Sequence, residues 1–138
     1  YTEAIYLAGV PYQCGGTTRE ELYALADKLH ALGAESVLIT SARMLVDGGW
    51  KPIACVVGYD AAADQHFILP YEELPVRFPG TGDIFSAVFM GHILRGDALK
   101  TAAQAAMQTV SKMLPQNADN QDKYKGIPLE TCLEDVVL

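Results

Sequence analysis

The residues best suited to chemistry stand together in the segment Gly80-Thr81-Gly82-Asp83. A proline-bounded extended stretch precedes this segment and a long apolar run follows it, which predicts a loop that opens a helix. The glycines allow a sharp turn and a close approach to a ligand. The first N–H groups of a helix lack internal partners and carry partial positive charge, so they suit an anion such as phosphate. Asp83 lies where a carboxylate could accept a proton from an attacking hydroxyl.

The helix predicted over residues 82–94 helps to decide whether this loop is functional or purely structural. Its sequence is apolar nearly all round, which is typical of a buried helix. We therefore expect it among the most buried elements, with Phe85, Val88 and Phe89 inaccessible. The four loop residues alone fit a purely structural turn equally well, because an Asp in a first turn often serves only the helix dipole. A buried helix favours the functional reading, since it would anchor the loop.

Gly80-Thr81-Gly82-Asp83, followed by a helix rich in small and aromatic residues, resembles the signature of the ribokinase-like superfamily of small-molecule kinases. Within it the chain looks most like the pyridoxal and pyridoxamine kinases. The resemblance implies that the backbone of Gly80, Thr81 and Gly82 holds the transferred phosphate and that Asp83 is the catalytic base. It also implies ATP and Mg²⁺ as cofactors. Arg77 is a candidate for a phosphate contact by proximity alone.

Three further residues are candidates in the first half of the chain. Glu3 lies in the first turn of a helix predicted over residues 2–9, where the helix dipole favours a carboxylate in any case. Thr40 and Ser41 lie at the C-terminal end of a buried strand predicted over residues 36–40, where α/β proteins bind ligands, although such residues are also ordinary in turns. The resemblance implies that Glu3 organises the metal indirectly, through water, and that Thr40 and Ser41 bind the nucleotide phosphates.

The order of helices and strands predicts an α/β fold. Strand 36–40 is expected to be parallel to a neighbour, whereas segments 53–59 and 65–71 are expected to pair antiparallel toward one edge. With the resemblance, this gives a three-layer ribokinase-like fold with a mostly parallel sheet, antiparallel edge strands and flanking helices. Thr17 or Thr18 can form a capping box with the Glu three residues later, and Asp97 is expected to cap a helix. Residues 131–138 fit a short helix or an edge strand.

Residues 1–138 are interpreted as a single domain, because no linker or repeat interrupts them. The sequence begins at Tyr1 and reads as already inside a helix. We therefore expect the C-terminal part of a longer kinase whose N-terminal half is missing. Such a piece should expose an apolar edge or face and should self-associate. The whole enzyme is expected to be a homodimer.

The composition is that of a globular protein, with 138 residues, of which 50% are hydrophobic and 20% charged. A formal net charge of −7 argues against a nucleic-acid surface. No apolar run reaches the roughly 18 residues of a membrane span. Cys14, Cys55 and Cys132 lack metal-ligand spacing and are read as reduced thiols of a cytoplasmic protein. His30 and His66 are expected to be exposed or satisfied rather than catalytic.

The resemblance implies an ATP-dependent kinase of vitamin B6 salvage that phosphorylates the hydroxymethyl group of pyridoxal, pyridoxamine or pyridoxine. One alternative is a hydroxymethylpyrimidine or phosphomethylpyrimidine kinase of the same superfamily. Another is a catalytically incomplete fragment, because the family places most substrate-ring contacts in its N-terminal half. A dinucleotide-binding fingerprint would need glycine where Phe85 stands, and no Gly-Lys-Ser/Thr follows the loop as in a Walker A motif.

Overall fold

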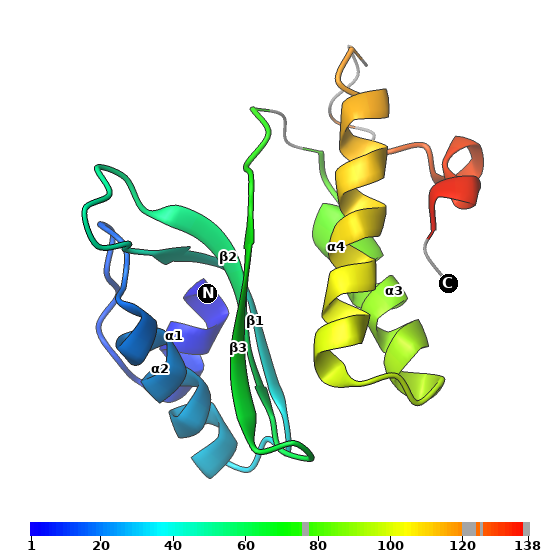
Figure 1. The fold of residues 1–138 in the computed structure, drawn as a ribbon. Helices are drawn as coiled ribbons and strands as arrows, with labels where there is room; N and C mark the ends of the chain where they lie inside the picture. The colour runs from blue at the N-terminus through cyan, green and yellow to red at the C-terminus, as the bar shows by residue number, and fades with distance from the viewer. Residues whose placement is uncertain (76–77, 120–123, 125, 137–138) are drawn as a thin grey trace. The chain divides into compact units, whose positions relative to one another are not determined.

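Two helices cover one face of a three-stranded sheet in the first part of the chain, Tyr1–Glu73, whereas the second part, Leu74–Leu138, is helical (Figure 1). The computed structural model describes residues 1–75, 78–119, 124 and 126–136, so Arg77 lies outside the described residues. The chain divides into these two compact units, and the interpretation of residues 1–138 as one domain stays a prediction. No helix in the described part is long and apolar enough to cross a membrane.

The first two helices begin and end where local signals indicate. Helix α1 (Thr2–Ala8) ends at Gly9, which adopts the left-handed conformation with φ of 62°. Helix α2 (Arg19–Ala31) begins at Thr18, whose hydroxyl accepts from the N–H of Glu21 while its own N–H donates to the Glu21 carboxylate at 2.9 Å. This reciprocal pair is the predicted capping box.

The sheet has the order β1-β2-β3, with strands β1 (Val37–Met44), β2 (Ile53–Asp60) and β3 (Gln65–Tyr71). The antiparallel pairing of β2 with β3 confirms the prediction. In the described residues the strand partner of β1 is also antiparallel, so the expected parallel neighbour is absent there. Parallel pairing within the same residues is limited to an isolated bridge between Thr17 and Met44. The mostly parallel sheet therefore stays a prediction.

The prediction that β1 ends at Thr40 was wrong. Strand β1 continues to Met44, so Thr40 and Ser41 lie inside it. The physical reason is a change of register between Ile39 and Ala42, where Ser41 adopts a positive φ of 57°. Such a bulge accommodates an extra residue and lets pairing resume beyond it.

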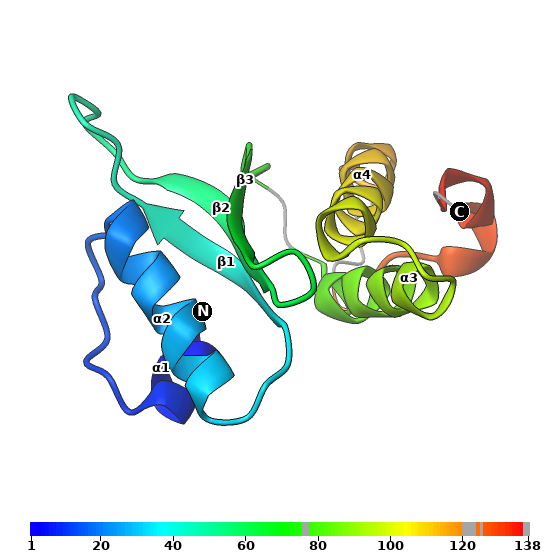
Figure 2. The same cartoon turned by 60° about the horizontal axis from the view of Figure 1, so that its bottom comes forward.

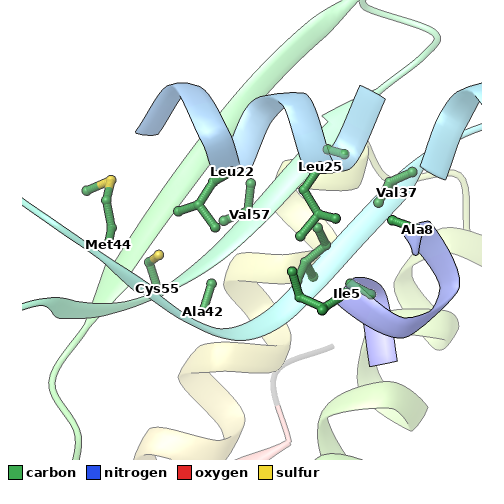
Figure 3. Packing of buried hydrophobic residues seen from close by; sticks show 12 residues of the cluster. Ile5, Ala8, Leu22, Leu25, Val37, Ala42, Met44, Cys55 and Val57 are labelled. Carbon is green, nitrogen blue, oxygen red and sulfur yellow. The ribbon is translucent and has the colours of Figure 1, made fainter. Parts of the chain in front are cut away.

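One apolar core joins α1, α2 and the sheet of the first unit. Figures 1 and 2 show both helices on the same face of the sheet, and Figure 3 shows their side chains meeting those of β1 and β2. Burial of these groups supplies the main stabilisation of this unit. The cluster comprises Ala4, Ile5, Ala8, Leu22, Leu25, Ala26, Val37, Ile39, Ala42, Met44, Cys55 and Val57.

The second unit is built on helices α3 (Thr81–Leu94) and α4 (Leu99–Gln116), which lie side by side. Small side chains on α4 allow close packing. Its buried positions are Ala102, Ala103, Ala105, Ala106, Thr109 and Met113. Two short 3₁₀ helices, Leu129–Thr131 and Leu133–Asp135, occupy the C-terminal stretch whose structure the sequence left open.

The expectation that helix 82–94 is among the most buried elements was wrong. His92 is its buried residue, whereas Phe85, Val88 and Phe89 are half-buried and Leu94 is 83% exposed. Phe85 and Phe89 stack on each other with ring centroids 6.3 Å apart. The reason is geometric. An all-round apolar sequence needs neighbours on every side, and within the described residues of the second unit α4 packs along one side of α3.

The contacts of Asp97 differ from the prediction that this residue caps a helix. Asp97 does not cap α4, whose N-cap is Ala98 without a side-chain hydrogen bond. Instead an Asp97 oxygen lies 2.6 Å from His92 Nδ1 and 3.0 Å from an Arg95 nitrogen. The hydrogen bond from His92 is the largest cause that lowers the pKa of Asp97.

The other two histidines behave as expected. His30 is exposed, and its Nδ1 lies 2.7 Å from the carbonyl oxygen of Ala34 beyond the end of α2. His66 Nε2 lies 2.6 Å from the carboxylate of Asp27, which joins β3 to α2. Both are satisfied by structural contacts.

Gly58 provides a test of the packing between β2 and β3. It lies opposite Phe67, and a Cβ at Gly58 would lie 2.1 Å from the Phe67 ring. We expect Gly58→Ala to lower the free energy of unfolding by about 1–3 kcal/mol through overpacking, measured by urea denaturation. The same change in a Phe67→Leu background should cost less, because the ring is gone. An equal cost in both backgrounds would show that the ring is not responsible.

The exposed apolar surface of α3 predicts self-association of the isolated chain. Met90 is 47% and Leu94 83% exposed. Replacing both with Glu should shift the sedimentation of the protein toward monomer at micromolar concentrations. A matched variant with Gln104→Glu and Gln108→Glu adds the same charge at exposed positions of α4 and should leave association unchanged. A wild-type chain that stays monomeric at high concentration contradicts the prediction.

Candidate functional site

The loop before α3 has the form expected of an anion site. Gly80 is the N-cap residue, with a φ of 86° that favours glycine, and no side chain caps the helix there. The Ile84 N–H donates to the Gly80 carbonyl at 3.0 Å, and the Thr81 hydroxyl donates to the Phe78 carbonyl at 3.2 Å. Because α3 begins at Thr81, the prediction of a loop that opens a helix is confirmed.

The space in front of the loop is open. A Cβ placed on Gly80 or Gly82 would meet no atom within 4 Å, and both Gly82 and Asp83 are exposed. The two glycines therefore have different roles. Gly80 is favoured by its own backbone conformation, whereas only a closely approaching ligand would require glycine at position 82. An anion at the helix N-terminus would be such a ligand.

The loop is anchored by the residue that precedes it. Phe78 is 4% exposed and belongs to a buried cluster with Met113, Ile127 and Cys132. This cluster, rather than burial of α3, holds the start of the loop. The sequence reasoning overlooked Phe78, although a single aromatic residue directly before the Pro-Gly turn was a usable signal.

In the first unit the structure brings Glu3 and Thr40 together. Both line a cavity of about 220 Å³, together with Tyr1, Ala4, Leu7, Leu29, Leu38 and Ile39. The side chain of Glu3 is 87% exposed, and its Oε2 atom lies 3.8 Å from the Tyr1 nitrogen. The backbone nitrogen of Tyr1 donates to the Thr40 carbonyl at 2.7 Å, which joins the start of α1 to the bulge in β1.

Ser41 has a different partner. Its side chain hydrogen-bonds the hydroxyl of Tyr71, a residue on β3 that the sequence reasoning did not single out. Burial raises the pKa of Tyr71, and the bond to Ser41 partly offsets that shift. Thr40 and Ser41 are both exposed, and the positive φ of Ser41 is the kind of backbone strain that recurs at ligand sites.

The donor atoms of the described residues limit the metal chemistry. No group of three or more His, Cys, Asp or Glu residues among them could hold a metal ion. The three cysteines are free, and burial raises the pKa of Cys55 to about 11, which makes it a poor nucleophile at neutral pH. Glu3, Thr40 and Ser41 belong to the first unit and Gly80–Asp83 to the second.

Comparisons with known proteins give partial but consistent matches. No family model matches the chain. A pyridoxal kinase of Rubrobacter xylanophilus is 31% identical over 112 residues, which cover 81% of this chain and 36% of that protein. A pyridoxal kinase of Arabidopsis thaliana is 28% identical over 107 residues and is covered over 34% of its length. The chain thus spans about a third of the curated relatives it matches.

The match in three dimensions covers nearly the whole chain. A Bacteroides thetaiotaomicron protein, described as a phosphomethylpyrimidine kinase and crystallised with pyridoxal, superposes with a TM-score of 0.84 at 30% identity. That superposition covers 99% of this chain and 47% of the other. Pyridoxal kinase from Lactobacillus plantarum superposes with a TM-score of 0.76 at 26% identity, over 98% of this chain and 46% of the other.

Fold and sequence together make the chain a relative of the ribokinase-like small-molecule kinases. Within that superfamily the matched proteins are pyridoxal kinases and a phosphomethylpyrimidine kinase, so the resemblance to pyridoxal kinases is confirmed. The partial coverage of every one of these relatives fits a piece of such a kinase.

Proposed function

We propose that this chain is the C-terminal part of an ATP-dependent kinase that phosphorylates the hydroxymethyl group of a B6 vitamer. The observation that carries the proposal is the N-terminus of α3. There a positive-φ Gly80 turns the chain, Gly82 leaves open space, and Asp83 is exposed beside both. The named relatives give the substrate class, since they are pyridoxal kinases.

Asp83 is the proposed base. As the substrate oxygen attacks the γ-phosphorus of ATP, its O–H bond breaks and the proton passes to the Asp83 carboxylate. The bond between the γ-phosphorus and the oxygen that bridges to the β-phosphate breaks, and ADP leaves. Exposure of Asp83 in the first turn of α3 leaves its oxygens accessible to a substrate hydroxyl. The phosphoryl group would gain charge stabilisation from the N–H groups of residues 80–83, which lie at the N-terminus of α3.

Nucleotide and metal would be held partly by the first unit. Mg²⁺ keeps several waters and binds proteins through one or two carboxylates plus substrate phosphates. The exposed Glu3 carboxylate and the neighbouring Thr40, on one cavity, fit that mode of indirect binding. Thr40 and Ser41 would contact the nucleotide phosphates. When bound, the metal would neutralise negative charge on the phosphates.

A second substrate class has a specific observation in its favour. The Bacteroides protein that superposes over 99% of this chain is described as a phosphomethylpyrimidine kinase. A hydroxymethylpyrimidine also presents a hydroxymethyl group on a nitrogen-containing ring, so the same base and loop would serve. Assaying the complete kinase with pyridoxal, pyridoxamine, pyridoxine and hydroxymethylpyrimidine decides between the two classes.

The 138-residue chain should be inactive alone, because it spans less than half of the superposed kinases. If the complete kinase turns over substrate and this chain does not, the result supports the proposal that the chain is one part of a longer kinase. Turnover by the chain alone would show that the ring-binding residues are already present in it.

Asp83→Asn in the complete kinase should remove the base and preserve the loop. General-base catalysis contributes about 10²–10⁴-fold, and we expect kcat to fall within that range. Nucleotide affinity should change little, because the N–H groups of Gly80–Gly82 remain. Near-normal turnover at saturating substrate would show that Asp83 is not the base and that its carboxylate only interacts with the helix dipole.

Gly82→Val should behave differently from Asp83→Asn. A side chain at position 82 fits the free protein, which offers open space there, but it occupies the place of the phosphate. Nucleotide affinity and turnover should therefore both fall. Steady-state kinetics and calorimetric titration with nucleotide separate the two outcomes. Unchanged affinity would mean that no phosphate approaches Gly82.

Ser41→Gly tests the nucleotide contact in β1. Glycine tolerates the positive φ, so the substitution removes the hydroxyl and relieves backbone strain. We expect weaker nucleotide binding without loss of the fold. Asp64→Gly is the matched control, because Asp64 also has a positive φ, of 48°, at the turn between β2 and β3. Equal affinities in the two variants would remove Ser41 from the proposed site.

A further inference from the structure

Gly126 lies close to the loop that precedes α3. It has a φ of 74°, and a Cβ placed on it would lie 2.7 Å from the carbonyl oxygen of Pro79. Real Cβ atoms essentially never approach a backbone atom this closely. Any other residue at position 126 would therefore force the Pro79 carbonyl, the backbone at position 126, or both to shift.

The Pro79 carbonyl is rigidly coupled to the loop. Its oxygen lies in the same planar peptide unit as the N–H of Gly80. Movement of that oxygen must rotate or displace the Gly80 N–H, which is the first donor of the loop. The proline ring fixes φ of residue 79 and limits how the chain can absorb the shift.

The segment that carries Gly126 is fastened to the same cluster as the loop. Ile127 is 8% exposed and packs with Phe78, Met113 and Cys132. Phe78 and Ile127 thus bind the two backbones together, one residue away from the contact between Pro79 and Gly126. Neither backbone can move aside without disturbing this packing.

We propose that Gly126 is a positioning residue, which fixes the Pro79–Gly80 peptide and so aims the N–H groups at the transferred phosphoryl group. The proposal rests on the proposed function of the loop. Positioning errors of this kind are costly, since a misplacement of about 1 Å can cost about 10²-fold in rate.

The chain offers a matched control for Gly126. Gly96 has a similarly positive φ of 94°, lies in the same unit, and a Cβ there would meet no atom within 4 Å. Asn adopts positive φ more readily than other residues. Gly126→Asn and Gly96→Asn therefore carry a similar backbone cost, and only the first adds the collision with Pro79.

Hydrogen exchange of the 138-residue chain, measured by mass spectrometry at low micromolar concentration, tests the contact without any activity. The informative amide is that of Ile84, which is bonded to the Gly80 carbonyl. We expect a peptide spanning residues 79–85 to exchange several-fold faster in Gly126→Asn and at the wild-type rate in Gly96→Asn. Equal exchange in both variants overturns the proposal.

Kinetics of the complete kinase test the consequence. Well below the melting temperature, Gly126→Asn should lower kcat by about 10- to 10²-fold with little change in KM for the B6 vitamer, and Gly96→Asn should match wild type. A variant that loses stability but keeps wild-type kcat overturns positioning in favour of a structural role. If Asp83→Asn retains full turnover, the proposed function fails instead. If Asp83→Asn is impaired and Gly126→Asn is not, only the present proposal fails.

Discussion

A phosphate site made of backbone N–H groups requires that the peptide presenting them be held still while its front stays empty. In the proposed phosphate site that peptide joins Pro79 to Gly80. The buried ring of Phe78 fixes the chain before it, and the bond from Thr81 to the Phe78 carbonyl closes the turn. The backbone at Gly126 runs so close that a Cβ there would lie 2.7 Å from the Pro79 carbonyl oxygen. The contacts named here fix the backbone around the loop, whereas a Cβ on Gly80 or Gly82 would meet no atom within 4 Å. This arrangement leaves room for a ligand at the two glycines.

In the first unit, too, a buried core holds the backbone that carries exposed polar residues. Its core lies between the helices and one face of the sheet, and Glu3 and Thr40 project from elements anchored in that core. Bulges often occur next to ligand sites because they re-aim side chains. The bulge at Ser41 gives the two neighbouring polar residues different surroundings: Thr40 lines the cavity with Glu3, and Ser41 bonds Tyr71.

Sequence reasoning succeeded where structure depends on residues a few positions apart. The stop at Gly9, the capping box of Thr18 and Glu21, and the loop at Gly80 are all local. It failed where the outcome depends on distant neighbours. The length of β1 depends on β2, which pairs with it on both sides of the bulge. The burial of α3 depends on what surrounds it, and the contact of Gly126 with Pro79 joins segments far apart in the chain.

Electrostatics explains why phosphate binding in the proposed site depends on the loop. The chain has a formal net charge of −7, and the roles proposed for Glu3 and Asp83 would bring two of its carboxylates near a triphosphate. Arg43 is already bonded to Glu73 at 2.8 Å, and Arg95 to Asp97 at 3.0 Å. These guanidinium groups are occupied by carboxylates. Because charges more than about 8 Å apart are largely screened at physiological salt, the attraction for a triphosphate must come from groups at the site itself.

Among the described residues of the proposed site, the groups that can attract a triphosphate are the N–H groups at the start of α3, and a metal held by the phosphates would add to them. Fixing the direction of those N–H groups is therefore a condition for phosphate binding.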